Sequence, residues 1–514
     1  MVRNKFKPLA IAAIILCLLS CSLVITAQTA VPNKREFRGA WIQCVNGQFQ
    51  GLSTSEMQQN LLHQLNVLQA EGANAIIFQV RPECDALYQS AIEPWSKFLT
   101  GRQGQAPSPY WDPLQWMINE CHKRGMELHA WINPYRAKTK TTTQLAANHI
   151  AVQHPEYTFQ YDGLLILNPA YKECRDHICT VAADIVQRYD VDGLHIDDYF
   201  YPYPVAGKPL PDTQQYQYYA THCQGTPMTI GDWRRENVNT FIRQLAATIK
   251  QVKPWVQFGV SPFGIYRNKQ SAPNGSNTRG TQNYDDLYAD CLKWADEGWT
   301  DYLVPQIYWQ IGHKSADYDT LIRWWNDYTS NRPLFIGEDI ERTVQYKDLA
   351  NPSQDQMQAK FNLHSQLPNV KGTVLWYSRV AVDNLGNYGS RLQQIYWRTP
   401  ALQPLMPFID KKKPGKVKKL KCLEIDGDQV LFWTAPKGDN WKEQAVKYVV
   451  YRFDKGDKID TDNPEKIVCI TPNTFYKLPK QATVEKKQKY TYIVTALNRL
   501  QNESSGAKVK VKVK

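Results

Sequence analysis

Between residues 37 and 396 the chain alternates short apolar segments with longer amphipathic segments, and it does so eight times. The apolar segments are rich in β-branched and aromatic residues, which is typical of strands that a parallel sheet buries on both faces. The segments between them place leucines and other apolar residues at helical spacing. Eight successive βα units of right-handed connection close into a TIM barrel, and an open doubly wound sheet is the alternative.

We therefore expect an α/β protein whose first large domain is a TIM barrel over residues 35–405. Asp112 and Pro113 form a helix start, with Asp as the N-cap and Pro at the first helical position. The expected strands are 37–43, 75–80, 127–132, 193–196, 258–261, 302–306, 334–337 and 372–377, and the expected helices are 55–70, 112–123, 171–188, 232–252, 284–296, 317–328, 354–365 and 388–396.

The last hundred residues differ from the barrel in both pattern and charge. Alternating segments at 429–433, 447–452 and 490–495 predict a small β-sandwich over residues 416–514, after a linker at 406–415. The order of its Trp and Tyr residues resembles a fibronectin type III module.

The net charge of the chain lies in this C-terminal region. Residues 411–514 contain 24 Lys and Arg against 12 Asp and Glu, which accounts for the whole net charge of +12. The barrel is then neutral, so the charge predicts no nucleic-acid partner; the basic domain could face anionic lipid, acidic wall polymers or only water.

The first residues form a targeting segment. Arg3, Lys5 and Lys7 precede an apolar run from Leu9 to Leu19, and the sequence Leu-Leu-Ser-Cys ends at Cys21. This pattern predicts a lipoprotein signal peptide at 1–20, lipid on Cys21 and a tether at 21–34, while a signal peptide cut near Ala27 or Ala30 is the alternative. We expect a lipid-anchored protein of the cell envelope, on the periplasmic side rather than the cell surface, and a monomer.

The cysteines give no sign of a disulfide framework or of a metal site. Removing Cys17 and Cys21 leaves nine, an odd number without framework spacing, so most are expected to be buried thiols. There is no Cys-x-x-Cys, His-Glu-x-x-His or calcium-loop pattern. We predict no metal and no cofactor.

The stretch from Val191 to Pro204 carries the clearest chemical signal. A short strand at 193–196 ends in Asp197 and Asp198 and continues into a loop of tyrosines and prolines. Two neighbouring carboxylates have different pKa values when they lie close together, so that one can donate a proton while the other is ionised. The pair is therefore predicted to be acid/base equipment, although an Asp-Asp pair can also be an exposed turn or a helix cap.

A TIM barrel builds its active site from the carboxyl ends of its strands. Those ends carry several indole, phenol, amide and guanidinium groups, which suit sugar rings because apolar C–H faces stack on aromatic rings while hydroxyls take hydrogen bonds. His195 points into the barrel and can equally be a core histidine. The candidate substrate-binding residues are Trp41, Gln79, Arg81, Trp131, Asn133, Tyr135, Arg136, His195, Tyr199, Tyr266, Arg267, Gln306, Tyr308, Trp309 and Trp376.

Six ordered motifs resemble the bacterial glycosyl hydrolase-like family ten over roughly residues 35–405. The resemblance implies a TIM-barrel glycosidase of the cell envelope that acts on peptidoglycan-type glycans. The motifs are Phe-Arg-Gly-Ala-Trp at 37–41, Phe-Gln-Val-Arg-Pro at 78–82, Ala-Trp-Ile-Asn-Pro-Tyr-Arg at 130–136, Asp-Gly-Leu-His-Ile-Asp-Asp-Tyr-Phe-Tyr-Pro at 192–202, Ser-Pro-Phe-Gly-Ile-Tyr-Arg at 261–267 and Pro-Gln-Ile-Tyr-Trp at 305–309.

Three functional hypotheses remain open at this point. In the first, the 2-acetamido group of an N-acetylhexosamine attacks, Asp197 orients that group and Asp198 is the acid/base, as in glycosidases with adjacent acids after strand four; by analogy alone, Tyr308 and Trp376 assist. In the second, Asp197 is the nucleophile and Glu338 the acid of a retaining enzyme that acts on a polysaccharide without acetamido groups. In the third, the protein binds glycans without cleaving them.

Overall fold

The structure is a computed structural model that describes residues 32–139, 144–329, 331–347, 351–480 and 488–513. The predicted signal peptide, Cys21 and most of the predicted tether lie outside these residues. Within the described residues, no helix has both the length and the apolar character that crossing a bilayer requires. The described cysteines are all free, and six of the nine are buried, which confirms that most are buried thiols.

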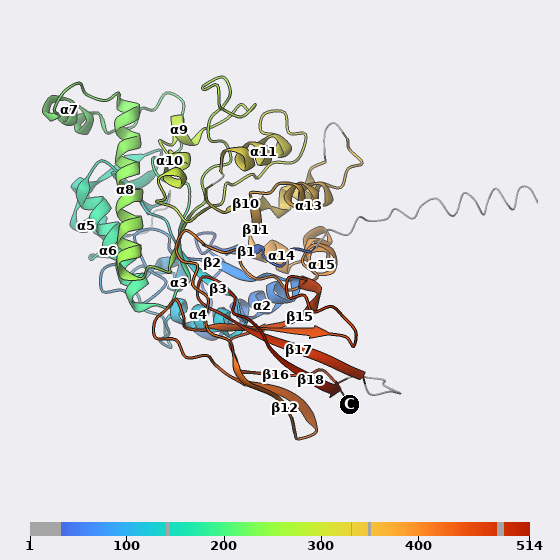
Figure 1. Cartoon of the computed structure of the whole chain (residues 1–514). Helices are drawn as coiled ribbons and strands as arrows, with labels where there is room; N and C mark the ends of the chain where they lie inside the picture. Colours follow the sequence, from blue (N-terminus) through green and yellow to red (C-terminus); the bar gives the residue numbers. More distant parts are fainter. Residues whose placement is uncertain (1–31, 140–143, 330, 348–350, 481–487, 514) are drawn as a thin grey trace, which may run out of the picture.

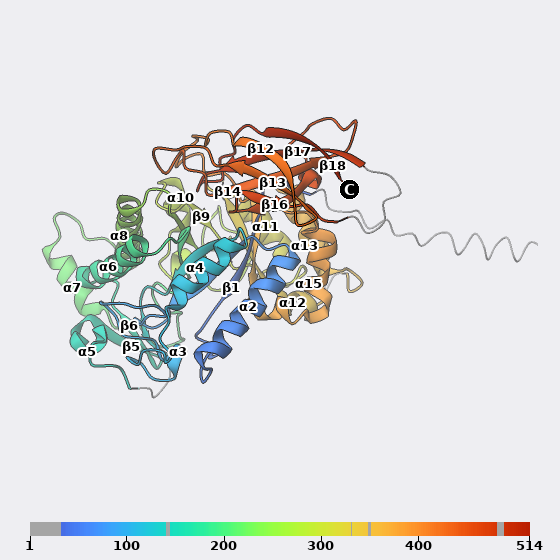
Figure 2. The same cartoon turned by 90° about the horizontal axis from the view of Figure 1, so that it is seen from below.

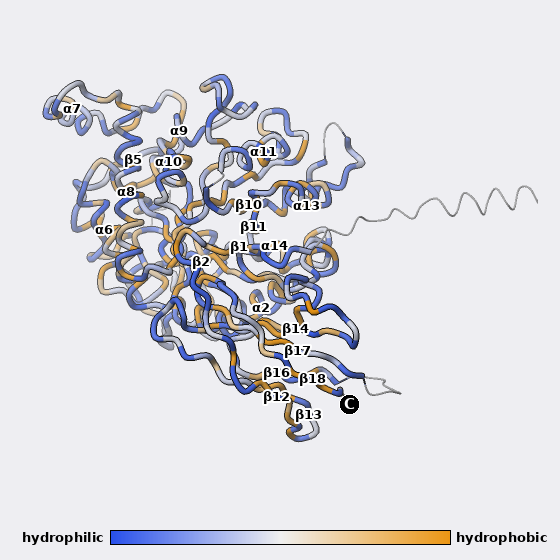
Figure 3. Tube along the Cα trace, viewed as in Figure 1, coloured by the Kyte–Doolittle hydropathy of each residue, from blue (hydrophilic) through white to orange (hydrophobic). Residues whose placement is uncertain are grey.

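Eight parallel strands form a closed barrel in the order β1-β11-β10-β9-β8-β7-β3-β2, which confirms the predicted TIM barrel. Figure 1 shows β1, β2, β3, β10 and β11 near the centre of the molecule with helices outside them. Most of their residues are buried, as the apolar runs predicted, and Figure 3 shows the apolar strands at the centre of the molecule. The strands are β1 Phe37–Ile42, β2 Ala75–Arg81, β3 Glu127–Ile132, β7 Gly193–Ile196, β8 Gln257–Val260, β9 Tyr302–Leu303, β10 Leu334–Asp339 and β11 Val370–Trp376.

The helices around the barrel begin where the sequence supplies caps. Ser53 and Glu56 form a capping box, and Asp112 accepts a hydrogen bond from the Gln115 amide. The principal helices are α2 Thr54–Glu71, α4 Pro113–Lys123, α6 Lys172–Arg188, α8 Ile230–Val252, α11 Tyr318–Tyr328 and α13 Gln356–Gln366; shorter ones are α3 Lys97–Thr100, α5 Ile150–Gln153, α7 Thr213–His222, α12 Ile340–Gln345 and α14 Ser378–Val382.

Three elements differ from the predicted ones for local reasons. The predicted helix at 284–296 divides into α9 (Asn283–Asp286) and α10 (Cys291–Asp296), because Tyr288 between them has a positive φ of 55°. The predicted strand at 302–306 pairs regularly only over β9, since Pro305 has no amide hydrogen to donate. The predicted helix at 388–396 is α15 (Tyr388–Arg391) followed by a π-helical turn, Leu392–Tyr396.

A small sheet that the sequence pattern did not predict lies in the loop after β3. It has the order β4-β6-β5, and its strands are β4 Arg136–Lys138, β5 Thr158–Tyr161 and β6 Leu164–Leu167. The strands are only three or four residues long, which is too short for a clear alternation. This sheet stands beside the loop that follows Asp197 and Asp198.

The C-terminal region forms two antiparallel sheets, as predicted for a sandwich. They have the orders β12-β13-β16 and β15-β14-β17-β18, and Figure 2 shows them packed along one side of the barrel. The likeness to a fibronectin type III module and the predicted domain limits stay predictions. The strands are β12 Lys418–Ile425, β13 Asp428–Thr434, β14 Lys447–Phe453, β15 Ile467–Thr471, β16 Phe475–Lys477, β17 Gln488–Leu497 and β18 Ala507–Val513.

The sandwich covers the end of the barrel at which the strands begin. Leu500 is fully buried there in a cluster with Phe37, Tyr302 and Phe335, and the Gln501 amide donates to Glu127 Oε1 at 2.7 Å. The opposite end, where the strands finish, remains for the candidate site.

Candidate active site

Asp197 lies directly after β7 and is surrounded by hydrogen-bond donors from the neighbouring strand. The Trp131 indole donates to Asp197 Oδ2 at 3.1 Å, and the Asn133 amide lies 3.1 Å from both carboxylate oxygens. Only 4% of Asp197 is exposed. Because β3 pairs with β7 in the barrel, these donors approach the carboxylate from a fixed side and set its orientation.

Asp198 takes its partners from other elements. The Tyr203 hydroxyl donates to Asp198 Oδ2, and Gln306, which follows β9, also hydrogen-bonds to the carboxylate. The Gln306 amide is itself fixed by the Ser261 carbonyl oxygen at 2.9 Å. The two neighbouring acids thus lie at the same barrel end but have separate sets of partners.

The surroundings of the two acids change their protonation. Burial raises the pKa of Asp197 to about 7, and the nearby Asp198 carboxylate adds to this rise while Arg136 opposes it. Burial also raises the pKa of Asp198, against hydrogen bonds from Tyr203 and Gln306. A pair of this kind holds a proton near neutral pH, which is what acid/base chemistry requires.

Three aromatic side chains from other parts of the barrel gather around Trp376 at the end of β11. The Trp376 ring centroid lies 6.0 Å from that of Trp41 and 6.3 Å from that of Trp131, both edge to face, and Tyr308 stacks on it at 6.1 Å. Trp376 and Tyr308 are partly exposed. Three of the predicted rim tryptophans therefore share one surface beside Asp197.

A second row of rings extends from the loop after Asp198. Tyr199, Tyr203, Phe263 and Trp309 contact one another in sequence, with centroid distances of 5.8, 5.9 and 5.5 Å, all edge to face. Tyr199 is 37% exposed. Partly exposed rings beside two carboxylates match the aromatic surface on which sugar rings stack.

His195 and Gln79 lie beneath the acids rather than among them. His195 Nε2 lies 2.9 Å from Ser261 Oγ and its Nδ1 lies 3.2 Å from the Tyr302 hydroxyl. Burial and the nearby His129 hold the pKa of His195 well below its usual value, so its ring is neutral. Gln79 Oε1 accepts the backbone amide of Cys44 at 3.0 Å and so fixes the turn after β1.

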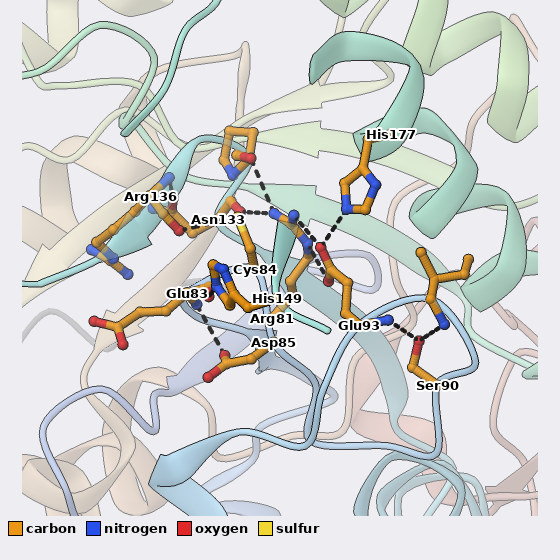
Figure 4. A network of polar contacts seen from close by, with 12 residues as sticks. Arg81, Glu83, Cys84, Asp85, Ser90, Glu93, Asn133, Arg136, His149 and His177 are labelled. Atoms are coloured by element: carbon orange, nitrogen blue, oxygen red, sulfur yellow. Dashed lines mark hydrogen bonds and ion pairs between the residues drawn. The ribbon is translucent and has the colours of Figure 1, made fainter. Parts of the chain in front are cut away.

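Arg81 belongs to a buried network behind the site (Figure 4). Its guanidinium forms an ion pair with Glu93 at 2.5 Å and donates to the Asn133 and Pro134 carbonyl oxygens at 2.6 and 3.0 Å. Burial acts to raise the pKa of Glu93, but Arg81 and His177 outweigh it and bring the pKa to about 2. Arg81 therefore fixes the turn that carries Asn133, the partner of Asp197.

Glu338 is fully surrounded by protein. Its Oε1 lies 2.6 Å from Lys360 Nζ and also accepts from the Thr343 hydroxyl, and the side chain is 1% exposed. Burial raises the pKa of Glu338, while Lys360 opposes this. The structure places this acid in an ion pair with Lys360 of the helix α13.

Three further candidates have partners among the surrounding elements. The Tyr266 hydroxyl donates to Asp290 at 2.8 Å, and Arg267 forms an ion pair with Asp285 at 2.8 Å. Tyr135 is buried against Phe241 with a centroid distance of 5.1 Å. Among the described residues, no three His, Cys, Asp or Glu side chains are grouped as a metal ion would require.

The sequence matches a known family over the part of the chain that builds this site. Residues 36–355, more than half of the chain, match the family described as Glycosyl hydrolase-like 10. The chain belongs to this family. It is 39% identical over 484 residues to glycosyl hydrolase YngK of Bacillus subtilis (strain 168), covering 92% of this chain and 93% of the relative. It is 37% identical over 336 residues to glycosyl hydrolase DigH of Escherichia coli (strain K12), covering 62% and 75%.

As a member of the glycosyl hydrolase-like 10 family, the protein is a glycoside hydrolase and its substrate is a glycan. Among solved structures, the catalytic domain of a β-amylase from Paenibacillus polymyxa has a TM-score of 0.45 at 11% identity, covering 70% of this chain and 95% of that chain.

Two residues of the glycosyl hydrolase-like 10 site were absent from the predicted set. Tyr203 donates to Asp198, and Phe263 joins the second row of rings. Tyr203 belongs to the Tyr-Pro loop after Asp198, so its proximity to that acid was a usable signal. Phe263 follows β8 within the motif Ser-Pro-Phe-Gly, and its position at a strand end was the only signal available.

Proposed function

We propose that this glycoside hydrolase cleaves a cell-envelope glycan of the peptidoglycan type at an N-acetylhexosamine, with Asp198 as the acid/base and Asp197 as the residue that assists the 2-acetamido group. The supporting observation is the pair of buried neighbouring acids with separate partners, Trp131 and Asn133 on Asp197 and Tyr203 and Gln306 on Asp198. The arrangement suits two different roles at one anomeric centre.

In the first step, the acetamido carbonyl oxygen attacks the anomeric carbon, and the bond to the leaving oxygen breaks. Asp198 donates its proton to that oxygen, and this is favourable because burial raises the pKa of Asp198. Asp197 accepts the amide N–H and stabilises the positive charge that develops on the cyclic intermediate. By analogy with other glycosidases, Tyr308, which stacks on Trp376 at the same end of the barrel, assists the acetamido group.

In the second step, Asp198 removes a proton from water, and the water oxygen attacks the anomeric carbon. The bond to the acetamido oxygen breaks, the amide is restored and the product keeps the anomeric configuration of the substrate. The same two acids therefore serve both steps, and no second carboxylate across the ring is needed.

The alternative with Asp197 as nucleophile and Glu338 as acid receives less support. Glu338 is paired with Lys360 at 2.6 Å and is 1% exposed, so it would have to leave an ion pair to reach a glycosidic oxygen. In contrast, Asp198 is bonded to a tyrosine and an amide, which are neutral partners.

Digestion of purified envelope polysaccharides, with the products identified by mass spectrometry, tests the proposal. The wild type should release fragments that end in an N-acetylhexosamine, and Asp198→Asn should lower the rate by about 10²- to 10⁴-fold. The same glycan after chemical removal of its acetyl groups should not be cleaved. Near-normal hydrolysis by Asp198→Asn, or a covalent enzyme adduct with a fluorosugar, would contradict the assignment, and tight binding without any product would favour a binding protein.

We further propose that the enzyme is exported and carries lipid on Cys21, on the periplasmic side of the envelope. The support is the basic start, the apolar run and the Leu-Leu-Ser-Cys sequence at 18–21. Labelling of cells with radioactive palmitate should mark the wild type and not Cys21→Ala. A mature protein without lipid whose first residue follows Ala27 or Ala30 would show that an ordinary signal peptidase acts instead.

A further inference from the structure

Three arginines lie at or after the ends of barrel strands on the active-site side, and they differ in their partners. Arg81 pairs with Glu93 at 2.5 Å and Arg267 pairs with Asp285 at 2.8 Å. Among the residues that the structure describes, no carboxylate oxygen lies within 4.0 Å of a guanidinium nitrogen of Arg136. Arg136 is therefore the one of these three cations whose charge has no protein carboxylate in direct contact.

The Arg136 side chain is nevertheless fixed in place. Its backbone amide donates to Asn133 Oδ1 at 2.9 Å, its Nε donates to the Pro82 carbonyl oxygen at 3.1 Å, and its guanidinium lies over the Tyr199 ring at 5.0 Å. The residue is 9% exposed. Figure 4 shows the side chain extending away from the Arg81–Glu93 pair. A guanidinium that is fixed at Nε, lies over the Tyr199 ring and also hydrogen-bonds to Tyr199 still has terminal N–H groups that can bind a carboxylate.

A pocket of about 220 Å³ lies beside Arg136, between the sheet β4-β6-β5 and the loop 199–205. Arg136, Tyr199 and Tyr203 line it, and Tyr203 is also the partner of Asp198. Asp162, at the edge of the same pocket, forms an ion pair with Lys208 at 2.7 Å, so its negative charge is offset. Tyr203 thus connects the pocket to the acid/base Asp198, and Arg136 gives the pocket a positive charge.

The two catalytic acids are the carboxylates that Arg136 influences from a distance. Its charge opposes the rise in the pKa values of Asp197 and Asp198, yet burial keeps both raised. A nearly buried guanidinium without a carboxylate in direct contact is only partly compensated, and a buried charge without a partner is unfavourable. An anionic group on the substrate would complete the pairing.

We propose that Arg136 binds a carboxylate carried by the sugar next to the scissile bond, so that the enzyme selects acidic N-acetylhexosamine glycans. The inference rests on the proposed function for the position of the scissile bond. Within the N-acetylhexosamine glycans of that proposal, the expected substrates are those with a sugar carboxylate, because a neutral N-acetylhexosamine polymer would leave the Arg136 guanidinium without a partner. Arg136 is then a specificity-determining residue and Asp198 remains the acid/base.

The experiment compares two forms of one purified N-acetylhexosamine glycan, one with free sugar carboxylates and one in which they have been reduced to alcohols. The wild type should cleave the acidic form with a kcat/KM about 10- to 100-fold higher, mainly through KM. Arg136→Gln should lose this advantage, so that its kcat/KM is the same for the acidic form and the reduced form. Arg136→Lys should recover part of the advantage, since it keeps the charge but not the two parallel hydrogen bonds.

Arg235→Gln is the matched control. Arg235 also lies over a tyrosine ring, Tyr284 at 4.1 Å, but it pairs with Asp232 on α8. This variant should keep the wild-type preference. The proposal is overturned if the wild type cleaves both forms equally, or if Arg136→Gln slows both forms by the same factor.

A binding measurement tests the role of Arg136 independently of whether the proposed glycan is cleaved. Calorimetry with Asp198→Asn should give a Kd for the acidic form about 10- to 100-fold lower than for the reduced form, and adding Arg136→Gln should remove the difference. If the wild type cleaves neither form, the proposed function fails, while the two Kd values still decide the role of Arg136. Equal Kd values for both forms would overturn the carboxylate site.

Discussion

The two ends of the barrel are built from the same eight strands but have opposite character. At the end where the strands begin, Phe37 stacks on Phe335 at 4.3 Å, and Leu500 of the C-terminal region closes the cluster. His129 there bonds to the Tyr302 hydroxyl at 2.7 Å, and Glu127 receives the Gln501 amide. His129 and Glu127 at this end thus have protein partners, and the C-terminal region covers them.

At the end where the strands finish, two acids are buried together, and burial raises the pKa values of both. Asp197 and Asp198 receive hydrogen bonds, but no Lys or Arg nitrogen among the described residues forms an ion pair with either. An arrangement of this kind costs stability, and it is retained where the chemistry needs it. The comparison indicates that one end of the barrel supplies stability and the other supplies reactivity.

The largest expected effect is a loss of activity from a substitution at the acid end of the barrel that a matched substitution at the covered end does not cause. Asp197→Asn should lower kcat by about 10²- to 10³-fold, because a neutral amide no longer stabilises the charge on the acetamido group. Glu127→Gln, the matched change at the covered end, should leave kcat within about twofold once the protein is folded. Steady-state rates on the purified glycan measure both, and an equal loss in the two variants would break the distinction between the ends.

The next largest effect is a loss of stability, without a loss of activity, from a substitution at the covered end of the barrel. Leu500→Ala should lower the free energy of unfolding by about 2–5 kcal/mol, because it leaves a cavity in a fully buried cluster. The kcat of the folded variant should be unchanged. Leu405→Ala, at a leucine that is 39% exposed, is the control and should change stability by less than about 0.5 kcal/mol. Denaturant unfolding measures these values, and a kcat that falls together with stability in Leu500→Ala would show that the covered end influences the site.

The end with the acids was more predictable from the sequence than the covered end. Strand 193–196 and the acids after it are adjacent in the chain, and strand ends define the site of any TIM barrel. The contact of Leu500 and Gln501 with the barrel joins residues several hundred positions apart, and no periodicity reports such a contact. The local sequence pattern therefore predicted the barrel and the sandwich, but it did not predict that the sandwich covers the end of the barrel at which the strands begin.

The partners of individual side chains were equally beyond sequence patterns. Arg81 and Glu338 occupy strand ends as predicted, but Glu93 and Lys360 pair with them from a loop and from α13. A strand end gives the direction of a side chain, whereas its electrostatic role depends on which charge the tertiary structure brings within about 4 Å. Tyr203 is the exception, because it lies only five residues after Asp198 and its position in the chain was a usable signal for the contact.

A third prediction follows from the pH dependence of stability. The pKa of Asp197 is about 7 in the folded protein, against an ordinary value near 3.8. Between these values the folded state binds more protons than the unfolded state, so the free energy of unfolding falls as pH rises from about 4 to about 7. Asn does not titrate, so Asp197→Asn should be more stable than the wild type by about 1–3 kcal/mol at pH 8 and by much less at pH 4.5.

Urea unfolding of both proteins at the two pH values checks this prediction. Asp296→Asn, at an exposed aspartate on α10, should show no comparable change with pH. A stability difference for Asp197→Asn that is the same at pH 4.5 and pH 8 would mean that burial at this end of the barrel does not raise the pKa of Asp197.

The smallest effect concerns the loop that borders the acids. Tyr203→Phe removes the hydroxyl that donates to Asp198, and a hydrogen bond of this kind favours the ionised carboxylate. The pKa of Asp198 should therefore rise, and since Asp198 acts first as an acid, the alkaline limb of the kcat/KM profile should move to higher pH. The maximal rate should fall by about tenfold or less, because the carboxylate loses one of its orienting partners.

Tyr218→Phe, at a tyrosine that is 69% exposed, is the control and should leave the kcat/KM profile unchanged. A shift of the alkaline limb to lower pH in Tyr203→Phe would show that Tyr203 favours the protonated acid, and the assignment of Asp198 as proton donor would then have to be exchanged with Asp197.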